Sequence, residues 1–251
     1  MYAADKCIRC GDCVKACEHH ALSWQDGPTS DLSVCVQCGE CVDSCMADAR
    51  RIVGEWITVD ELIERIRSDV VFFDESGGGV TFSGGEPLMQ PDFLLAALRI
   101  CKADGIQTAV DTCGFAAPEL VVRIRDHVDL FLFDLKLADT DRHRQFTGVD
   151  NALILQNLCM LVRNNKSVVV RIPVIPGIND DDSNIRGSMA LLAQIGIQRV
   201  DLLSYHATGM DKCRRLGSPF RLPEVRPPST EKMRELSEWF GREGFAVRIG
   251  G

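Results

Sequence analysis

The sequence has no long apolar run, no excess of basic residues and no low-complexity region. Its longest apolar stretches, such as residues 130–133, are far too short to span a bilayer, and no signal peptide opens the chain. We therefore expect a soluble, cytoplasmic protein with no membrane partner. The formal net charge of −8 argues against a nucleic-acid partner, because duplex binders usually carry a basic footprint.

The overall composition is that of a globular protein. A hydrophobic fraction of 45% and a charged fraction of 25% predict a packed core. A length of 251 residues allows one large α/β domain, or a small domain attached to a larger one.

Cysteine, by contrast, is abundant and unevenly placed. Of the 12 cysteines, eight lie between residues 7 and 45, and the other four are Cys101, Cys113, Cys159 and Cys213. A secreted disulfide scaffold would spread its bridges over a small domain, whereas these clustered cysteines precede a long α/β pattern. We therefore expect the clustered cysteines to bind metal in a reducing compartment.

The eight cysteines form two copies of one pattern, CIRCGDCVKAC at residues 7–17 and CVQCGECVDSC at residues 35–45. In C-x2-C-x2-C, three thiolates hold one cluster, and the next helical turn carries the fourth Cys to the other cluster. The Gly after each second Cys lets the backbone approach the cluster. The pattern predicts two [4Fe–4S] clusters. Their ligand sets are Cys7, Cys10, Cys13 with Cys45, and Cys35, Cys38, Cys41 with Cys17.

Structural zinc is the alternative, since C-x2-C pairs are common in zinc sites. Zinc needs four ligands and would leave the third Cys of each triplet without a role. The repeats depart from the usual cluster pattern at one place, because Glu18 and Met46 stand where a proline commonly follows the fourth Cys. This change affects the local turn and removes no ligand.

From residue 55 onward, the pattern alternates between helix and strand. The expected strands cover residues 80–83, 108–111, 130–134, 167–174, 200–204 and 246–249. The expected helices cover residues 58–67, 91–103, 118–126, 151–163, 182–194 and 230–242. Apolar, β-branched strands that alternate with helices predict a parallel sheet, either doubly wound or closed as a (β/α) barrel. We expect a ferredoxin-like domain at residues 1–53 and the α/β domain at residues 54–251.

Polar side chains recur at the carboxyl ends of the expected strands, where ligands bind in parallel α/β folds. They are SGGE at 83–86, Asp111 with Thr112, Asp134 with Lys136, Arg171, and Ser204 with His206. The carboxylates of Glu86 and Asp134 suit an ammonium group, and the cations Lys136 and Arg171 suit a carboxylate. We therefore expect an amino-acid moiety as ligand. Each residue taken alone also has a structural interpretation, such as a turn or an ion pair.

In this order, the motifs resemble the activating enzymes of glycyl radical enzymes, relatives of pyruvate formate-lyase activating enzyme in the radical SAM superfamily. The resemblance is strongest to the subgroup with an inserted two-cluster ferredoxin domain. The motifs are TFSGGEP at 81–87, DTCGF at 111–115, FDLK at 133–136, FTGV at 146–149, RIPVIPGIN at 171–179, LLSYH at 202–206 and RPPST at 226–230. The resemblance implies a partial TIM-like (β/α) radical SAM barrel, preceded by a small ferredoxin-like domain.

The resemblance also implies that the barrel binds S-adenosylmethionine. The residues expected at its methionine amino group are Ser83, Gly84, Gly85 and Glu86. Lys136 and Arg171 would hold the carboxylate, and His206 would lie by the nucleoside. The residues that match a monovalent cation site in relatives are Asp111, Thr112 and Asp134. For Asp134 we prefer this cation to the ammonium group.

The activity implied by the resemblance is radical generation on a protein partner. Reductive cleavage of S-adenosylmethionine gives a 5′-deoxyadenosyl radical, which abstracts hydrogen from a backbone glycine of a glycyl radical enzyme. The ferredoxin clusters would relay electrons from flavodoxin or ferredoxin. This chemistry needs a third [4Fe–4S] cluster, held by a C-x3-C-x2-C loop that precedes the ferredoxin insertion.

No C-x3-C-x2-C motif occurs in these residues. The four scattered cysteines are too far apart to replace it, and we interpret them as packing or site-lining thiols. We expect an N-terminally shortened family member, through start-site assignment, gene truncation or the manner of production. Its barrel would lack the first strand and have an exposed edge. We also expect that this chain cannot cleave S-adenosylmethionine, and that only a full-length form holds the third cluster.

Two other functions remain open beside the activating enzyme. One is a two-cluster electron-transfer or partner-binding protein with a non-catalytic barrel, which would hold about 8 iron atoms rather than about 12. The other is a non-functional remnant with an unstable barrel. We favour the activating enzyme as the family role, and the identity of the target enzyme is not encoded in the sequence.

Overall fold

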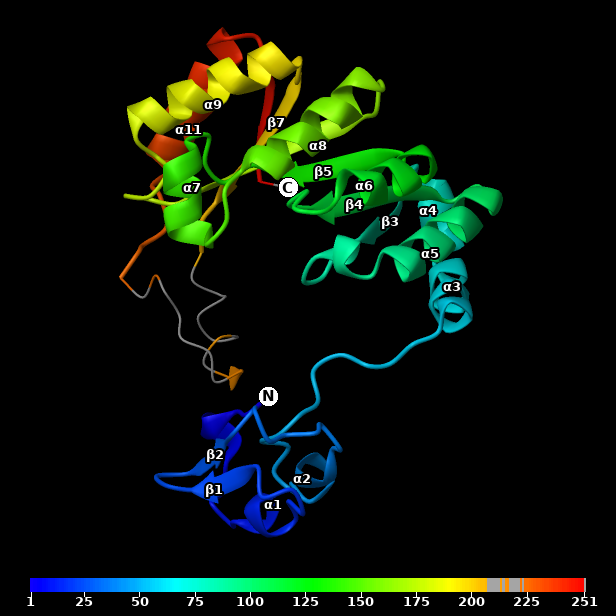
Figure 1. The fold of residues 1–251 in the computed structure, drawn as a ribbon, viewed down its shortest axis with the longest axis vertical. Coiled ribbons are helices and arrows are strands. Elements are labelled where there is room, and N and C mark those ends of the chain that lie inside the picture. Colours follow the sequence, from blue (N-terminus) through cyan, green and yellow to red (C-terminus); the bar gives the residue numbers. More distant parts are fainter. Residues whose placement is uncertain (207–212, 214, 217–221, 223, 251) are drawn as a thin grey trace. The chain divides into compact units, whose positions relative to one another are not determined.

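The computed structural model describes residues 1–206, 213, 215–216, 222 and 224–250 (Figure 1). The chain divides into two compact units. The first comprises residues 1–56 and 206–224, and the second comprises residues 57–205 and 225–251. No helix in the described ranges is both long enough and apolar enough to cross a lipid bilayer.

In the first unit, the two cysteine repeats fold alike. Each carries a one-turn helix, α1 (Asp12–Lys15) or α2 (Glu40–Asp43). The residue before each helix is a glycine, Gly11 with φ 80° or Gly39 with φ 95°. Glycine adopts this left-handed conformation without strain, so the repeated Gly turns the chain sharply after the second Cys.

A short hairpin and a terminal pairing complete the first unit. Strands β1 (Leu22–Trp24) and β2 (Pro28–Ser30) pair antiparallel between the two repeats. A 3₁₀ turn, η1 (Ala4–Lys6), precedes the first cysteine. Tyr2 forms an antiparallel bridge with Arg50, which joins the start of the unit to the segment after the second repeat.

The second unit is built on a six-stranded, all-parallel sheet whose strands follow the chain order β3-β4-β5-β6-β7-β8. The strands are β3 (Gly79–Phe82), β4 (Gln107–Thr112), β5 (Leu130–Asp134), β6 (Val168–Val174), β7 (Arg199–Ser204) and β8 (Ala246–Ile249). The predicted parallel α/β fold is therefore confirmed. Among the described residues, β3 and β8 are the two edges of the sheet.

Helices α3 (Val59–Ser68) and α4 (Val70–Ser76) precede β3, and the other helices of this unit alternate with its strands along the chain (Figure 1). These others are α5 (Pro91–Ala103), α6 (Pro118–Ile124), α7 (Thr140–Thr147), α8 (Ala152–Arg163), α9 (Asp182–Ile195) and α11 (Thr230–Arg242). Two 3₁₀ turns, η2 (Pro87–Met89) and η3 (Arg125–His127), are also present. The helix predicted over residues 118–126 ends at Ile124, and the chain continues as η3.

Two helices were not expected from the sequence. Helix α7 reads TDRHRQFT, which has almost no apolar residues and therefore no helical periodicity to detect. The helix is stabilised at its N-cap, where the Asp139 carboxylate accepts a hydrogen bond from the backbone N–H of Arg142 at 2.7 Å. Only one residue separates the start of helix α4 from the end of α3. The sequence therefore contains no separate N-cap signal before the short apolar run of α4.

The two faces of the sheet have different roles. One face, with Val110, Phe131 and Val170 at its centre, packs with helices α5, α6, α8, α9 and α11 in a continuous apolar core. Side chains alternate across a strand, so the intervening residues point to the opposite face. That opposite face carries Asp111, Asp134 and Arg171, none of which is fully buried. One face of the sheet therefore carries charged side chains, and the other face packs in the apolar core.

Candidate functional sites

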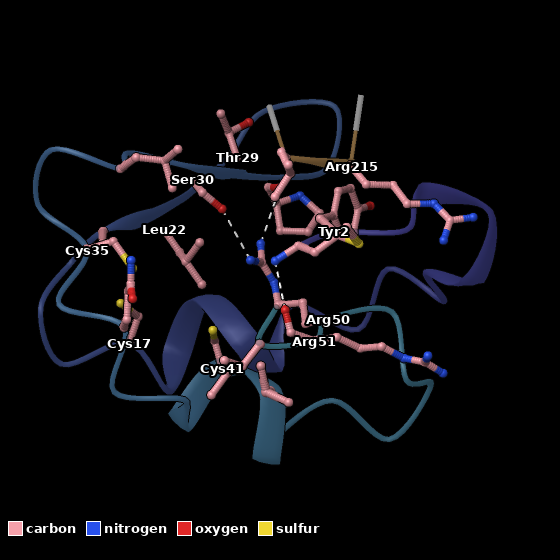
Figure 2. Close-up of a pocket in the computed structure, with 18 of the residues that line it drawn as sticks. Tyr2, Cys17, Leu22, Thr29, Ser30, Cys35, Cys41, Arg50, Arg51 and Arg215 are labelled. Carbon is pink, nitrogen blue, oxygen red and sulfur yellow. Dashed lines mark hydrogen bonds between the residues drawn. The ribbon is translucent and has the colours of Figure 1, made fainter. Parts of the chain in front are cut away.

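The eight cysteines of the repeats line two separate cavities of the first unit. The smaller cavity, of about 20 Å³, is lined by Cys7, Cys10, Cys13 and Cys45. The larger cavity, of about 850 Å³ (Figure 2), is lined by Cys17, Cys35, Cys38 and Cys41. The fourth cysteine of each repeat thus lies with the first three of the other repeat. This grouping supports the predicted ligand sets, which stay a prediction.

The donor chemistry of these cavities suits iron–sulfur clusters. Cys7 Sγ accepts the backbone N–H of Arg9 at 3.4 Å, and hydrogen bonds of this kind stabilise cluster-bound thiolates. Within the described ranges, no three cysteine, histidine or carboxylate side chains converge closely enough to hold one metal ion. In a cubane the four thiolates bind four different irons, so they lie farther apart than ligands of a single ion.

At the strand ends of the second unit, ion pairs connect three neighbouring strands. Arg171 Nη1 donates to Asp111 Oδ2 at 2.7 Å, from β6 to β4. Arg171 Nε lies 3.9 Å from Asp134 Oδ1, and Lys136 Nζ lies 3.5 Å from Asp134 Oδ2. The structure therefore brings four of the predicted residues together, although it already pairs Asp111 with Arg171.

Glu86 is fixed by the strand next to its own. Its Oε1 accepts from the Thr112 hydroxyl at 2.6 Å and from the backbone N–H of Leu88 at 3.1 Å. Its Oε2 accepts from the backbone N–H of Cys113 at 2.9 Å. The carboxylate thus ties the loop after β3 to the end of β4. It leaves Ser83, Gly84 and Gly85 exposed beside it.

Two buried polar atoms at the strand ends lack hydrogen bonds. Asp134 Oδ1 and Arg171 Nε have no hydrogen-bond partner within the described ranges. Leaving such groups unpaired costs free energy, so a bound polar ligand or ion would stabilise them. Nearby, a Cβ added to Gly84 or Gly85 would meet nothing within 4 Å, so the backbone there faces open space. Both observations fit a small polar ligand with charges of both signs.

Burial changes the acidity of two side chains at this site. It raises the pKa of Asp134 above its usual value, against the opposing influence of Lys136 and Arg171. Burial also raises the pKa of the Cys113 thiol, and the neighbouring Glu86 carboxylate adds to that effect. Cys113 therefore lines the site as a neutral thiol.

Sequence reasoning missed a row of alternating charges across the sheet. In the register, Asp134 pairs with Arg171, Arg171 with Asp201, and Asp201 with Arg248, on strands β5 to β8. Burial raises the pKa of Asp201, and Arg248 and Arg171 oppose this rise. Only the strand register places these residues side by side, and no spacing in the sequence indicates it.

Sequence reasoning also missed a buried amide beneath the site. Asn179 is 1% exposed. Its Nδ2 donates to the backbone carbonyls of Lys136 at 2.8 Å and Pro173 at 2.6 Å. Its Oδ1 accepts the backbone N–H of Ile175 at 2.7 Å. Asn179 thereby joins the segment after β5, which carries Lys136, to the end of β6, the strand that carries Arg171.

Replacing Asn179 with alanine is expected to lower the free energy of unfolding by about 3 kcal/mol, because three buried backbone groups lose their partner. Urea unfolding followed by far-UV circular dichroism measures the effect. The matched control is Gln156→Ala, which removes an exposed amide from α8 and should change stability by less than about 0.5 kcal/mol. Equal losses in the two variants would show that the Asn179 contacts contribute nothing specific.

The remaining predicted residue, His206, is exposed and lies two residues after the end of β7. It begins the segment that belongs to the first unit. Ser204 ends β7 and is partly buried. The expected role of His206 beside a nucleoside stays a prediction.

Comparison with protein families gives two matches. Residues 41–186 match the model of the radical SAM superfamily, and residues 6–49 match the model of the 4Fe-4S dicluster domain. The superfamily match begins inside the second cysteine repeat. Cys41 and Cys45 have the spacing of the first two cysteines in C-x3-C-x2-C, but Asp48 stands at the third position.

Two curated proteins illustrate the similarity to full-length relatives. The trans-4-hydroxy-L-proline dehydratase activating enzyme of Clostridioides difficile is 41% identical, over 100% of this chain and 84% of that protein. The choline trimethylamine-lyase activating enzyme of Oleidesulfovibrio alaskensis is 41% identical, over 86% of this chain and 73% of that protein.

A solved structure supports the same relationship. It is a domain of pyruvate-formate lyase-activating enzyme from Bacteroides vulgatus, 35% identical, with a TM-score of 0.59. The alignment covers 69% of this chain and 99% of that domain.

Proposed function

The chain belongs to the activating enzymes of glycyl radical enzymes in the radical SAM superfamily, and we propose that it serves to place a glycyl radical on a partner enzyme. The observation that carries this proposal is a pair of buried atoms without a hydrogen bond, Asp134 Oδ1 and Arg171 Nε, which lie 3.9 Å apart toward the carboxyl ends of the strands. They lie where parallel α/β folds bind their ligands.

The chain's own residues would hold the amino-acid part of S-adenosylmethionine. Arg171 is anchored by Asp111 through Nη1, whereas Nε lies 3.9 Å from Asp134 Oδ1 without a hydrogen bond and would donate to the carboxylate of the ligand. Lys136, with 38% of its side chain exposed, offers a second cation. Both oxygens of Glu86 already accept hydrogen bonds, so we propose that the exposed backbone of Ser83 to Gly85 meets the amino group.

A monovalent cation is the other occupant proposed at this site. Its oxygens would come from Asp111, Thr112 and Asp134. Such a cation would share Asp111 with Arg171, because these two side chains are already ion-paired. It would also offset the unfavourable burial of the Asp134 carboxylate. We propose that His206 lies beside the nucleoside.

We propose a ferredoxin-like domain at residues 1–53 that holds two [4Fe–4S] clusters, and a radical SAM barrel at residues 54–251. When bound, the two clusters would relay single electrons toward the third cluster that cleavage of S-adenosylmethionine requires. The eight repeat cysteines would hold them as Cys7, Cys10, Cys13 with Cys45, and Cys35, Cys38, Cys41 with Cys17. The partners are a glycyl radical enzyme and, as electron donor, flavodoxin or ferredoxin.

We propose that residues 1–251 alone do not cleave S-adenosylmethionine, because they contain no C-x3-C-x2-C motif. After reconstitution, the chain should bind about 8 iron atoms, at four for each cluster. Incubation with dithionite and S-adenosylmethionine should yield no enzymatic amount of 5′-deoxyadenosine, as measured by chromatography. Twelve iron atoms per chain, or catalytic formation of this product, would contradict the proposal.

The activating-enzyme role has its own test in the reading frame upstream of Met1. A coding segment with C-x3-C-x2-C in frame supports the role for this gene product. Its absence would instead support electron transfer or partner binding by a two-cluster protein. The missing motif is the observation that favours this second function.

A further inference from the structure

One buried cation lies at both cysteine-lined cavities of the first unit. Arg50 lines the cavity of Cys7, Cys10, Cys13 and Cys45 and also the cavity of Cys17, Cys35, Cys38 and Cys41. Its side chain points into the larger cavity toward Ser30 (Figure 2). Arg50 is only 6% exposed, so solvent screens its charge poorly.

Arg50 is held in place by neutral groups only. Nη1 donates to Ser30 Oγ at 3.2 Å, and Nη2 donates to the carbonyl of Pro28 at 3.4 Å. The guanidinium carbon lies 5.3 Å from the centre of the Tyr2 ring. Nε is buried without a hydrogen-bond partner, and no carboxylate within the described ranges forms an ion pair with Arg50. A buried charge without a counter-charge is unstable, so an anionic group belongs nearby.

Thiolate-bound iron–sulfur clusters supply such an anionic group. Because Arg50 lines the cavities of both cysteine sets, its charge acts on an anionic cluster in either cavity. Reduction adds one electron to a cluster and makes it more negative. A fixed cation therefore stabilises the reduced form more than the oxidised form and raises the reduction potential.

We propose that Arg50 tunes both clusters, as a shared buried counter-charge that raises their reduction potentials together. This inference rests on the cluster assignment proposed above. Its consequence is an electron relay in which one side chain makes the reduction of both clusters more favourable.

The test is a potentiometric titration of the reconstituted protein, followed by EPR of the reduced clusters. In Arg50→Gln, the ratio of reduced to oxidised cluster at a fixed potential should fall at least tenfold for both clusters. For a one-electron couple, this corresponds to a shift of about 59 mV to more negative potential. Arg50→Lys keeps the charge and should retain most of the original midpoints.

The matched control is Arg51→Gln, which removes the same charge from the neighbouring, exposed position. It should shift both midpoints far less, because solvent and salt screen an exposed charge. Equal shifts in the Arg50→Gln and Arg51→Gln variants would overturn the proposal. A shift in Arg50→Lys as large as in Arg50→Gln would also overturn it, since packing rather than charge would then be responsible.

Arg50→Met keeps the proposal testable if Arg50→Gln fails to assemble its clusters. This variant removes the charge but keeps an unbranched side chain, and it should shift both midpoints to more negative potential. Unchanged midpoints would contradict the proposal. A wild-type iron content well below about 8 per chain would instead refute the underlying cluster assignment, so the two failures are distinguishable.

Discussion

The double variant Cys17→Ala/Cys35→Ala is expected to keep one cluster, with about 4 iron atoms per chain. Cys7→Ala/Cys17→Ala, which removes two cysteines of the same repeat, is expected to keep none. The reason is the crossed arrangement of the two cavities, in which Cys17 lies with Cys35 and apart from Cys7. Two substitutions in one ligand set damage one cluster, whereas one substitution in each set damages both.

Iron analysis and the absorbance of the reconstituted variants measure this difference. The single variants Cys17→Ala and Cys45→Ala serve as references, because each should lose one cluster. Cys101→Ala is the matched control, since this buried thiol packs with α3 in a separate apolar group and should leave both clusters in place. If Cys7→Ala/Cys17→Ala retained one cluster and Cys17→Ala/Cys35→Ala none, each repeat would hold its own cluster.

Replacing Gly114 with alanine should be among the most destabilising single changes in the second unit. Gly114 follows β4 with φ 69°, and an added Cβ would lie 2.1 Å from Cζ of Phe133. Phe133 is 1% exposed and belongs to the main core, so its ring has no room to withdraw. The strained backbone and the overpacked ring together should cost about 3 kcal/mol or more.

Gly105 is the matched control, because it has φ 74° but nothing within 4 Å of an added Cβ. Gly105→Ala should therefore cost only about 1 kcal/mol, the contribution of the backbone conformation. Urea unfolding measures both variants. Equal losses would mean that the contact with Phe133 is unimportant. A double variant that also carries Phe133→Leu should recover part of the loss at Gly114, since the two positions are in contact.

The strands of the sheet were predictable because the residues within each strand are enough to indicate it. Strands 130–134 and 168–174 consist mainly of apolar residues, which in the second strand are mostly β-branched, and this composition predicts buried parallel strands. Helix α5 was predicted with its bounds, because Pro91 begins it and its apolar residues recur at helical spacing. Helix α7 escaped prediction because its polar residues give no periodicity, and its cap at Asp139 is a weak signal alone.

The candidate sites were predictable only where residues share a motif. Asp134 and Lys136 lie on one strand end, so their proximity follows from their spacing. Asp201 and Arg248 join the site through strand register, and Arg50 reaches both cysteine cavities through its pairing with Tyr2. Such contacts depend on the three-dimensional path of the chain. Asn179 was quoted within a motif, but its burial beneath Lys136 could not be read from the sequence.

The row of alternating charges on β5 to β8 restricts which substitutions this protein can accept during evolution. Asp134, Arg171, Asp201 and Arg248 are neighbours in register, and their charges alternate in sign along the row. Loss of Arg171 alone would remove the cation that lies between Asp134 and Asp201, and both carboxylates are partly buried. A substitution that changes the charge at one of these positions therefore favours a second substitution, at a neighbouring position of the row, that restores a charge of opposite sign. Homologues should show correlated variation along this row, with the alternation of sign retained even where the residues differ.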